Sequence, residues 1–428
     1  MADLQKQTEF DVPAERVRQW LSSPGATQRL TPAYLGKYPG TKDLTWVSEV
    51  GVDSLGEGRS VFTDTIRYEP SGFNKAQERQ IEVFTELLDY RSRQLAVELE
   101  FAQSVAHVEP MVVAMSGSSG MVGTELTALL QTLGHTVRPL VRRPAEDDLE
   151  ISYNPGSQEI ELEKLRECDA VINLAGESIF GRYTERKKQQ LSTSRIMPTR
   201  LFTKSLETLA EDGKKRVMVS ASAVGYYGAH ASHGPNPPLL TEEDTWGIDV
   251  LAKTCLNWEA TGTSDVFRTV NLRLGLVMTP AGGLMGTLMP LVSAGLAGRL
   301  GEHLWNSWVS VGDALRAFVF AMVNEDMRGV YNVVSDKPVL NDELITKYSE
   351  AMGQSPFMPV PSFAPKLILG AEAADTLALA SQRVSNQKIK EAGFRFRMND
   401  LDTLFAHILP SPHPSPLSNV ARVVRTIA

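Results

Sequence analysis

The sequence has little that points to a metal site, a disulfide framework or a membrane anchor. Its two cysteines, Cys168 and Cys255, lie far apart, and its seven histidines show no metal-ligand spacing. No apolar run reaches the roughly 18 residues of a membrane-spanning helix, and the first residues lack an apolar signal core. We therefore expect no metal, no membrane span and a cytoplasmic location, which fits the low cysteine content.

An excess of positive charge is also missing. The 43 Lys and Arg residues are outnumbered by 51 Asp and Glu residues, which gives a net charge of -8. This balance argues against a general nucleic-acid or anionic-membrane binder. The hydrophobic content of 42% is ordinary for a globular protein, and 428 residues are too many for a single core.

Three regions with different patterns divide the chain. Residues 1–108 are polar, with short alternating stretches such as 60–66 and a helical pattern over 81–101. Residues 109–335 alternate short apolar runs with helical patterns. Residues 336–428 are mostly helical, with proline breaks. We expect an N-terminal α+β domain, a central α/β domain and a small C-terminal helical domain with a tail.

The central region has the pattern of a doubly wound α/β fold. Its first run, 111–115, is continuously apolar, as expected for a strand buried on both faces, and an amphipathic helix follows over 120–133. Further strands are expected over 136–141, 170–174 and 217–220, with a long charged helix over 184–209. Strands separated by helices predict a parallel sheet with its ligand site at the carboxyl ends of the strands.

A glycine-rich turn joins the first strand to the first helix. Gly117 permits a tight turn, Gly120 lets the backbone approach a diphosphate, and Gly123 lets the helix lie close to the strand. The free amides of the helix N-terminus would bind the phosphates. The alternative is an ordinary turn in a protein that binds no nucleotide. The spacing favours a Rossmann-type dinucleotide site, with these residues as contacts: Gly117, Ser118, Ser119, Gly120, Met121, Val122 and Gly123.

Two arginines after the second strand indicate which dinucleotide is bound. NAD enzymes place a carboxylate there for the ribose 2′-hydroxyl, but this sequence has Arg142 and Arg143, with no acid before Glu146. A guanidinium suits a 2′-phosphate, so we expect NADP(H). Arg142 is the stronger candidate because it lies nearer the strand end, and Arg143 is equally explained as a solvated surface charge.

Residues 111 to about 410 resemble the extended short-chain dehydrogenase/reductase superfamily. Within it, they resemble one branch in particular, the epimerase family proteins, which are also called nucleoside-diphosphate-sugar epimerase-like. The N-terminal region resembles START-like helix-grip domains in a shortened form, which implies an apolar ligand there. The matching segments of the main region are Met115–Gly120, Val171–Glu177, Ser220–Gly228, Trp258–Glu259, Leu272–Gly275, Ser307–Ser310 and Gly393–Phe396.

This resemblance assigns roles to individual residues. It implies that Ser222 is the active-site serine that polarises or holds a substrate oxygen, and that segment 173–176 lines the side of the cleft that holds the nicotinamide ribose. A small-molecule substrate is expected, and a homodimer is the oligomer considered. The remaining cofactor contacts expected from the resemblance are Leu174, Ala175, Gly176, Ser220, Arg273 and Gly275.

The sequence departs from the superfamily at its catalytic Tyr-x-x-x-Lys pair. In the superfamily the lysine lowers the tyrosine pKa and holds the ribose, and the tyrosine carries the proton. Counted back from Glu259, the two positions hold Leu251 and Cys255, which can do neither. Lys253 points elsewhere on the helix and is expected in solvent.

Three residues are candidates for a replacement acid. Tyr226 and Tyr227 follow Ser222 by four and five residues, and the alternative for both is packing. Glu177 follows the glycine of the Asn-Leu-Ala-Gly segment, and its alternative is a helix cap or an ion pair with Arg182 or Arg186. For Arg195, on the long helix, we expect a structural salt bridge.

Three functions are compatible with this pattern. The first is an NADP(H)-dependent oxidoreductase or nucleotide-sugar epimerase-like enzyme that acts on a small polar substrate. The second, favoured by the missing pair, is a non-catalytic NADP(H)-binding sensor. The third is an accessory protein whose N-terminal domain carries an apolar ligand.

Overall fold

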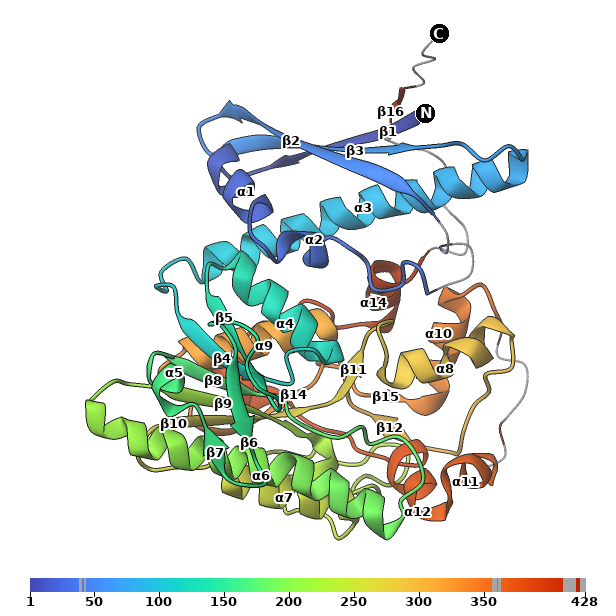
Figure 1. Ribbon diagram of the computed structural model, residues 1–428. Helices are drawn as coiled ribbons and strands as arrows, with labels where there is room; N and C mark the ends of the chain where they lie inside the picture. Colours follow the sequence, from blue (N-terminus) through green and yellow to red (C-terminus); the bar gives the residue numbers. More distant parts are fainter. Residues whose placement is uncertain (38–40, 42–43, 356–359, 361–362, 411–420, 424–428) are drawn as a thin grey trace.

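The chain folds into an N-terminal sheet with a long helix, a large central sheet between two helical layers, and a C-terminal group of short helices (Figure 1). The computed structural model describes residues 1–37, 41, 44–355, 360, 363–410 and 421–423. No helix in this described part is both long and apolar enough to cross a lipid bilayer.

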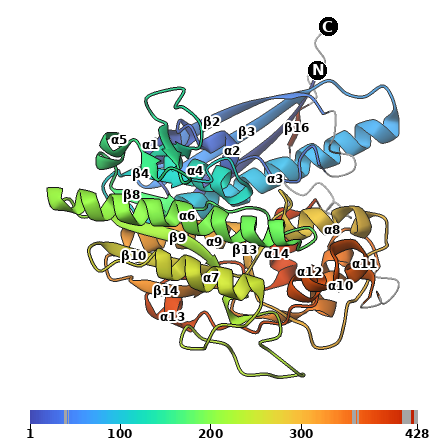
Figure 2. The ribbon, with the colours of Figure 1, turned by 60° about the horizontal axis from the view of Figure 1, so that its bottom comes forward.

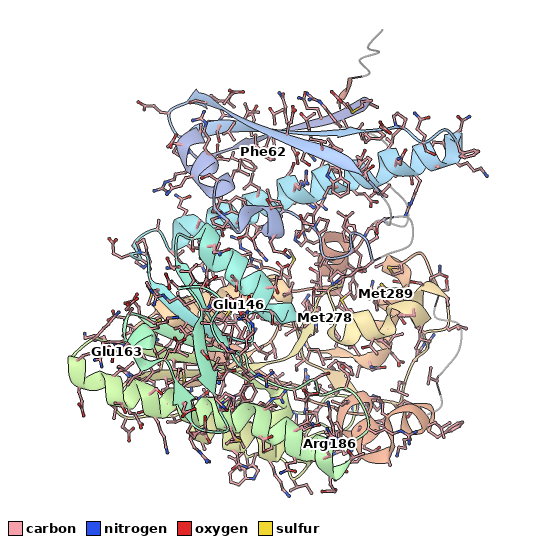
Figure 3. All side chains as sticks on the ribbon, viewed as in Figure 1. Phe62, Glu146, Glu163, Arg186, Met278 and Met289 are labelled. Atoms are coloured by element: carbon pink, nitrogen blue, oxygen red, sulfur yellow. The ribbon has the colours of Figure 1, made fainter. Side chains whose placement is uncertain are left out.

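The N-terminal unit is an antiparallel sheet of order β16-β1-β3-β2 on which one long helix lies. Alternate residues of β3 are buried, and Phe62, fully buried, contacts Leu95 of α3 in the resulting core (Figure 3). The strand β16 (Ala421–Val423) pairs with β1, so segments from both ends of the chain share one sheet. The other elements are β1 (Ala2–Phe10), α1 (Ala14–Leu21), α2 (Ala26–Arg29), β2 (Trp46–Gly56), β3 (Arg59–Tyr68) and α3 (Asn74–Ser104).

The central sheet has eight strands in the order β14-β10-β9-β8-β4-β5-β6-β7. All neighbours are parallel except β6 and β7. From β4 the chain continues through β5, β6 and β7 on one side of β4, and then crosses to β8 on the other side. This reversal of strand order opens a crevice at the carboxyl ends of β4 and β8. The predicted doubly wound α/β fold is confirmed. The strands are β4 (Val112–Ser116), β5 (Thr136–Val141), β6 (Ile151–Asn154), β7 (Glu159–Ile160), β8 (Ala170–Asn173), β9 (Val217–Ala223), β10 (Arg268–Leu274) and β14 (Gly329–Val333).

Helices cover both faces of this sheet (Figure 2). Side chains of β4 alternate between the two cores: Met115 packs with Leu126 of α4, whereas Ala114 packs with Phe202 of α6. The period of two along a strand produces this alternation. The covering helices are α4 (Met121–Thr132) and α9 (Val311–Val323) on one face, with α5 (Leu162–Arg166), α6 (Glu185–Leu209) and α7 (Val250–Thr261) on the other.

The C-terminal helices pack on a segment that precedes them. Trp308 is fully buried in a cluster with Leu344 and Phe405, while Ile389 and Phe394 return to the core of the central sheet. The division at residue 335 stays a prediction, because the packing crosses it in both directions. The elements are β11 (Leu276–Met278), α8 (Gly283–Ser293), β12 (Trp305–Asn306), β13 (Trp308–Ser310), β15 (Val339–Leu340), α10 (Asn341–Ala351), α11 (Ala364–Leu369), α12 (Ala371–Ala373), α13 (Gln387–Glu391) and α14 (Leu401–Ile408).

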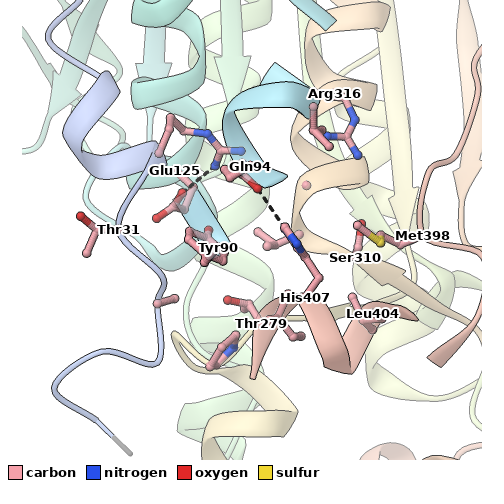
Figure 4. A pocket seen from close by; sticks show the side chains of 17 residues that line it. Thr31, Tyr90, Gln94, Glu125, Thr279, Ser310, Arg316, Met398, Leu404 and His407 are labelled. Atoms are coloured by element: carbon pink, nitrogen blue, oxygen red, sulfur yellow. Dashed lines mark hydrogen bonds and ion pairs between the residues drawn. The ribbon is translucent and has the colours of Figure 1, made fainter. Parts of the chain in front are cut away.

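The N-terminal unit is seated directly on the first helix of the central domain. A Cβ on Gly25, at the start of α2, would lie 2.0 Å from the carbonyl oxygen of Ala128 in α4. Buried Arg29 forms ion pairs with Glu98 of α3 and Glu125 of α4. A cavity of about 50 Å³ lies beside this contact, where His407 of α14 also reaches α3 (Figure 4).

Candidate functional site

The glycine turn between β4 and α4 has the geometry that a bound diphosphate requires. Gly117 has a φ of +69°, which favours glycine. A Cβ on Gly123 would lie 2.0 Å from the carbonyl oxygen of Gly117, so helix and turn touch through their backbones. Gly120 precedes the first helical turn, and no side chain caps that end of the helix. The uncapped amides fit phosphate oxygens.

The two arginines beyond β5 have different surroundings. Arg143 donates to both carboxylate oxygens of Glu150 at 2.7 Å and approaches Glu146 at 3.3 Å. Arg142 is exposed, and its side chain forms no hydrogen bond or ion pair among the described residues, although its charge acts on Glu177. Because β5 is the neighbour of β4 in the sheet, the side chain free to meet a ligand beside the glycine turn is Arg142.

The carboxyl end of β8 forms the opposite wall of the turn. A Cβ on Gly117 would lie 2.8 Å from the carbonyl oxygen of Leu174. Asn173 accepts a hydrogen bond from Ser116 and donates to Thr199 and Ser220, which ties three strands and α6 together. Ser220 is buried below the crevice rather than exposed to it.

Two further residues of this wall are Gly176 and Glu177. A Cβ on Gly176 would lie 3.0 Å from the guanidinium carbon of Arg195. Glu177 is half exposed and forms an ion pair with Lys187 at 2.9 Å. That hydrogen bond and the lysine charge lower the pKa of Glu177. The Glu177 side chain is therefore ionised at neutral pH, and its ion-pair partner differs from the Arg182 or Arg186 considered above.

Ser222 belongs to a buried ion-pair network. Its hydroxyl donates to Glu259 Oε1 at 2.6 Å. Arg273 donates to the same carboxylate from Nε at 2.8 Å and from Nη2 at 2.7 Å. All three side chains are buried. Gly275 follows closely, and a Cβ there would lie 2.5 Å from the carbonyl oxygen of Ser307, so this glycine is required by packing.

Both tyrosines after Ser222 also contact Arg273. The guanidinium carbon lies 3.3 Å from the ring centroid of Tyr226. Tyr227 accepts a hydrogen bond from Arg273 Nη1 at 3.1 Å and donates to Asn332 Oδ1 at 2.8 Å. Burial raises the pKa of Tyr227 to about 12. The structure therefore brings Ser222, both tyrosines and Arg273 together around Glu259, but leaves Glu177 outside this group.

The α7 positions of the missing pair are apolar or neutral. Leu251 packs beside Gly225, and Cys255 is buried in a cluster that includes both tyrosines. Lys253 is exposed, as predicted. No cation on α7 therefore faces the crevice at the positions where the superfamily has its catalytic pair.

Both cysteines should be inert in the native protein. Burial raises the pKa of Cys168 to about 11 and that of Cys255 to about 12, so at pH 8 both are neutral thiols. Ellman's reagent should label neither until denaturant is added, and should then label both. Rapid labelling of the native chain would contradict the packing of α7 described here.

Sequence reasoning gave no role to Glu259 or Asn332, although both hold the candidate catalytic residues in place. The only available signal was the Trp258–Glu259 pair among the segments of the resemblance. The salt bridge expected for Arg195 is absent from the described part of the chain. Its guanidinium donates instead to the backbone carbonyls of Leu191 and Glu177.

Comparison with known proteins identifies the family. Residues 113–334 match the model of the NAD dependent epimerase/dehydratase family, and residues 360–408 match a domain of unknown function. An epimerase family protein of Mycobacterium bovis is 35% identical over 306 residues, which are 70% of this chain and 98% of that protein. The chain belongs to the NAD-dependent epimerase/dehydratase family.

Two solved structures are similar to this epimerase family member over most of its length. The nucleoside-diphosphate sugar epimerase of Corynebacterium glutamicum is 25% identical, with a TM-score of 0.76 over 95% of this chain and 90% of that one. The human epimerase family protein SDR39U1 with NADPH is 26% identical, with a TM-score of 0.60 over 70% of this chain and 99% of that one. The first match reaches into the N-terminal unit.

Proposed function

We propose that this chain binds NADP(H) across the carboxyl ends of β4, β5 and β8 and uses it in a redox reaction of a small polar substrate. The diphosphate would contact the segment Gly117–Gly123, and Arg142 would hold the 2′-phosphate. The observation that carries this proposal is an uncapped helix N-terminus beside an exposed arginine, directly after β5, that has no ion-pair partner among the described residues. The human family member solved with NADPH supports the choice of cofactor.

The cofactor would supply or accept the hydride, and the chain would position the substrate. Leu174, Ala175 and Gly176 would line the nicotinamide side, above Ser220. Ser222 is the proposed contact for a substrate oxygen. Because its proton is donated to Glu259, the Ser222 oxygen is better placed to accept a hydrogen bond from a substrate hydroxyl than to donate one to a carbonyl. The roles of Tyr226, Tyr227, Glu177, Arg273 and Gly275 stay predictions.

A non-catalytic sensor is the second candidate, and one observation favours it. Leu251 and Cys255 remove the usual proton carrier and its cation. The test is NADPH oxidation in the presence of sugar nucleotides, quinones or aldehydes. Substrate-dependent oxidation that Ser222→Ala reduces would support an enzyme. Tight NADPH binding without turnover on any of these compounds would favour the sensor.

The N-terminal unit has a filled interior. Its order of β1, two helices, two strands and a long helix is compatible with a shortened helix-grip domain. Its interior is filled by side chains such as Val17, Trp20, Phe62 and Leu95, so an apolar ligand would have to displace them or bind elsewhere. The carried ligand and the homodimer stay predictions.

Arg142→Ala should weaken NADPH binding selectively. Loss of a charge-assisted contact to the 2′-phosphate should cost about 1–3 kcal/mol, which corresponds to a roughly tenfold to hundredfold higher Kd, while NADH binding stays the same. Calorimetric titration of both cofactors measures this difference. Arg143→Ala is the matched control, because Glu150 already occupies that side chain. Equal losses for NADPH and NADH would contradict the assignment.

A further inference from the structure

The crevice lacks a cation at the position where the superfamily has its lysine. Cys255 occupies that position on α7, is buried, and has a raised pKa because of burial. In the superfamily the lysine at this position holds the ribose next to the nicotinamide. A chain that keeps the cofactor but lost this lysine needs another donor for those ribose hydroxyls.

A cation does lie beside this position, on the neighbouring helix. The guanidinium carbon of Arg195, on α6, is 5.3 Å from the ring centroid of Trp258, three residues after Cys255 on α7. The charge of Arg195 also acts on the Cys255 thiol. On its other side the guanidinium lies against Gly176, where a Cβ would come within 3.0 Å of it. Arg195 therefore lies between the end of β8 and the Cys255–Trp258 turn of α7.

Among the described residues, no carboxylate forms an ion pair with Arg195, although the charge of Glu177 acts on it from farther away. Nη1 donates to the carbonyl of Leu191 and Nη2 to that of Glu177, both at 3.0 Å, and Nη1 also donates to Ser194 Oγ at 3.5 Å. No carboxylate in the described residues lies within ion-pair distance of it, and the Glu177 side chain is taken by Lys187. Burial lowers the pKa of Arg195, yet an arginine stays charged. A half-buried cation without an anion is costly in a purely structural role.

Gly176, which has no side chain, lies directly beside the Arg195 guanidinium. Gly176 belongs to the Asn-Leu-Ala-Gly segment at the carboxyl end of β8, where a parallel sheet of this type places its ligand. A Cβ there would come within 3.0 Å of the guanidinium, so a larger side chain would require Arg195 to shift. The absence of a side chain thus leaves Arg195 beside the crevice wall, and no described contact engages its Nε.

We propose that Arg195 replaces the missing lysine and donates hydrogen bonds to the hydroxyls of the nicotinamide-side ribose. This inference rests on the proposed cofactor binding. The planar guanidinium has five donors; Nη1 is used by the Leu191 carbonyl and Ser194 Oγ, and Nη2 by the Glu177 carbonyl, which fixes its orientation. Remaining donors, including Nε, would meet the ribose, and its charge would lie near the reacting end of the cofactor.

The test compares two ligands that differ at that ribose. NADPH contains it, whereas adenosine 2′,5′-bisphosphate keeps the 2′-phosphate and lacks the nicotinamide riboside. Arg195→Met keeps a long apolar side chain against Trp258 but removes the donors. It should raise the Kd of NADPH about tenfold to a hundredfold and leave the Kd of the bisphosphate within twofold. Arg195→Lys, which keeps a charged donor, should recover part of the loss.

Arg200→Met is the matched control, because Arg200 is exposed on the same helix and forms no hydrogen bond or ion pair among the described residues. It should change neither Kd. Equal NADPH affinity for Arg195→Met and Arg200→Met would overturn the role of Arg195. If Arg195→Met raises the Kd of both ligands equally, the ribose assignment is also wrong. If Arg195→Met does not fold, Arg195→Lys takes its place in the comparison. An equal change in the Kd of NADPH and of the bisphosphate for Arg195→Lys would then overturn the ribose assignment. Failure of the wild-type chain to bind NADPH would instead overturn the proposed function.

Discussion

Gly123→Ala will abolish measurable NADPH binding and destabilise the fold. The new methyl carbon would lie 2.0 Å from the carbonyl oxygen of Gly117 and 2.8 Å from Ser118 Cα. These are backbone atoms, so no change of rotamer can relieve the collision, and α4 must move away from the turn. We expect a Kd at least about a hundredfold higher, since the amides that bind phosphate move with the helix. Overpacking should also cost about 1–3 kcal/mol of unfolding free energy.

The effect is measured by NADPH titration and by urea unfolding without cofactor. Gly286→Ala is the matched control, because Gly286 lies in α8 and a Cβ there meets nothing within 4 Å. It should bind NADPH normally and gain up to about 1 kcal/mol from helix propensity. NADPH affinity within threefold of wild type in Gly123→Ala would show that the diphosphate lies elsewhere.

Glu259→Gln should cause the largest loss of stability of any single neutralisation near the crevice. It leaves the Arg273 guanidinium, only 3% exposed, without its counter-ion. Removing one partner of a buried pair costs about 3–5 kcal/mol. Ser222→Ala keeps the ion pair and loses one hydrogen bond, so it should cost about 1 kcal/mol. Urea unfolding of both variants at neutral pH measures the difference.

An exposed pair provides the comparison. Glu163, at the surface of α5 (Figure 3), contacts Arg166 at 3.2 Å with 83% of its side chain exposed. Glu163→Gln should change the unfolding free energy by less than about 1 kcal/mol. If Glu259→Gln proved no more destabilising than Glu163→Gln, the network around Ser222 would not be held by charge.

Local sequence patterns were sufficient to predict the central fold. The strand expected over 111–115 is found at Val112–Ser116, and the strand over 136–141 is found with the same bounds. Continuous apolar runs and a glycine turn are signals that need no tertiary context. The N-terminal sheet was harder to predict. The strand β2 is mostly exposed on both faces, so it lacks the alternation that reveals a half-buried strand.

The candidate site also has one half that the sequence could predict and one half that it could not. Its cofactor half depends on residues adjacent in sequence, from Gly117 to Gly123, and could be predicted from them. Its catalytic half depends on Glu259 meeting Arg273, an approach decided by how α7 packs against β10. Likewise, Arg195 was expected to form a salt bridge because its position relative to Gly176 and Trp258 follows only from the packing of α6 against α7.

The close approach of Gly25 to Ala128 limits how far the N-terminal unit can move against α4. A domain joined only by a linker can swing, but this one touches the dinucleotide helix through its backbone and is fastened there by Arg29. Any tilt of α4 would be transmitted to the whole antiparallel sheet. The described N-terminal sheet and helices are thus joined to the nucleotide-binding core by direct packing and not through the chain alone.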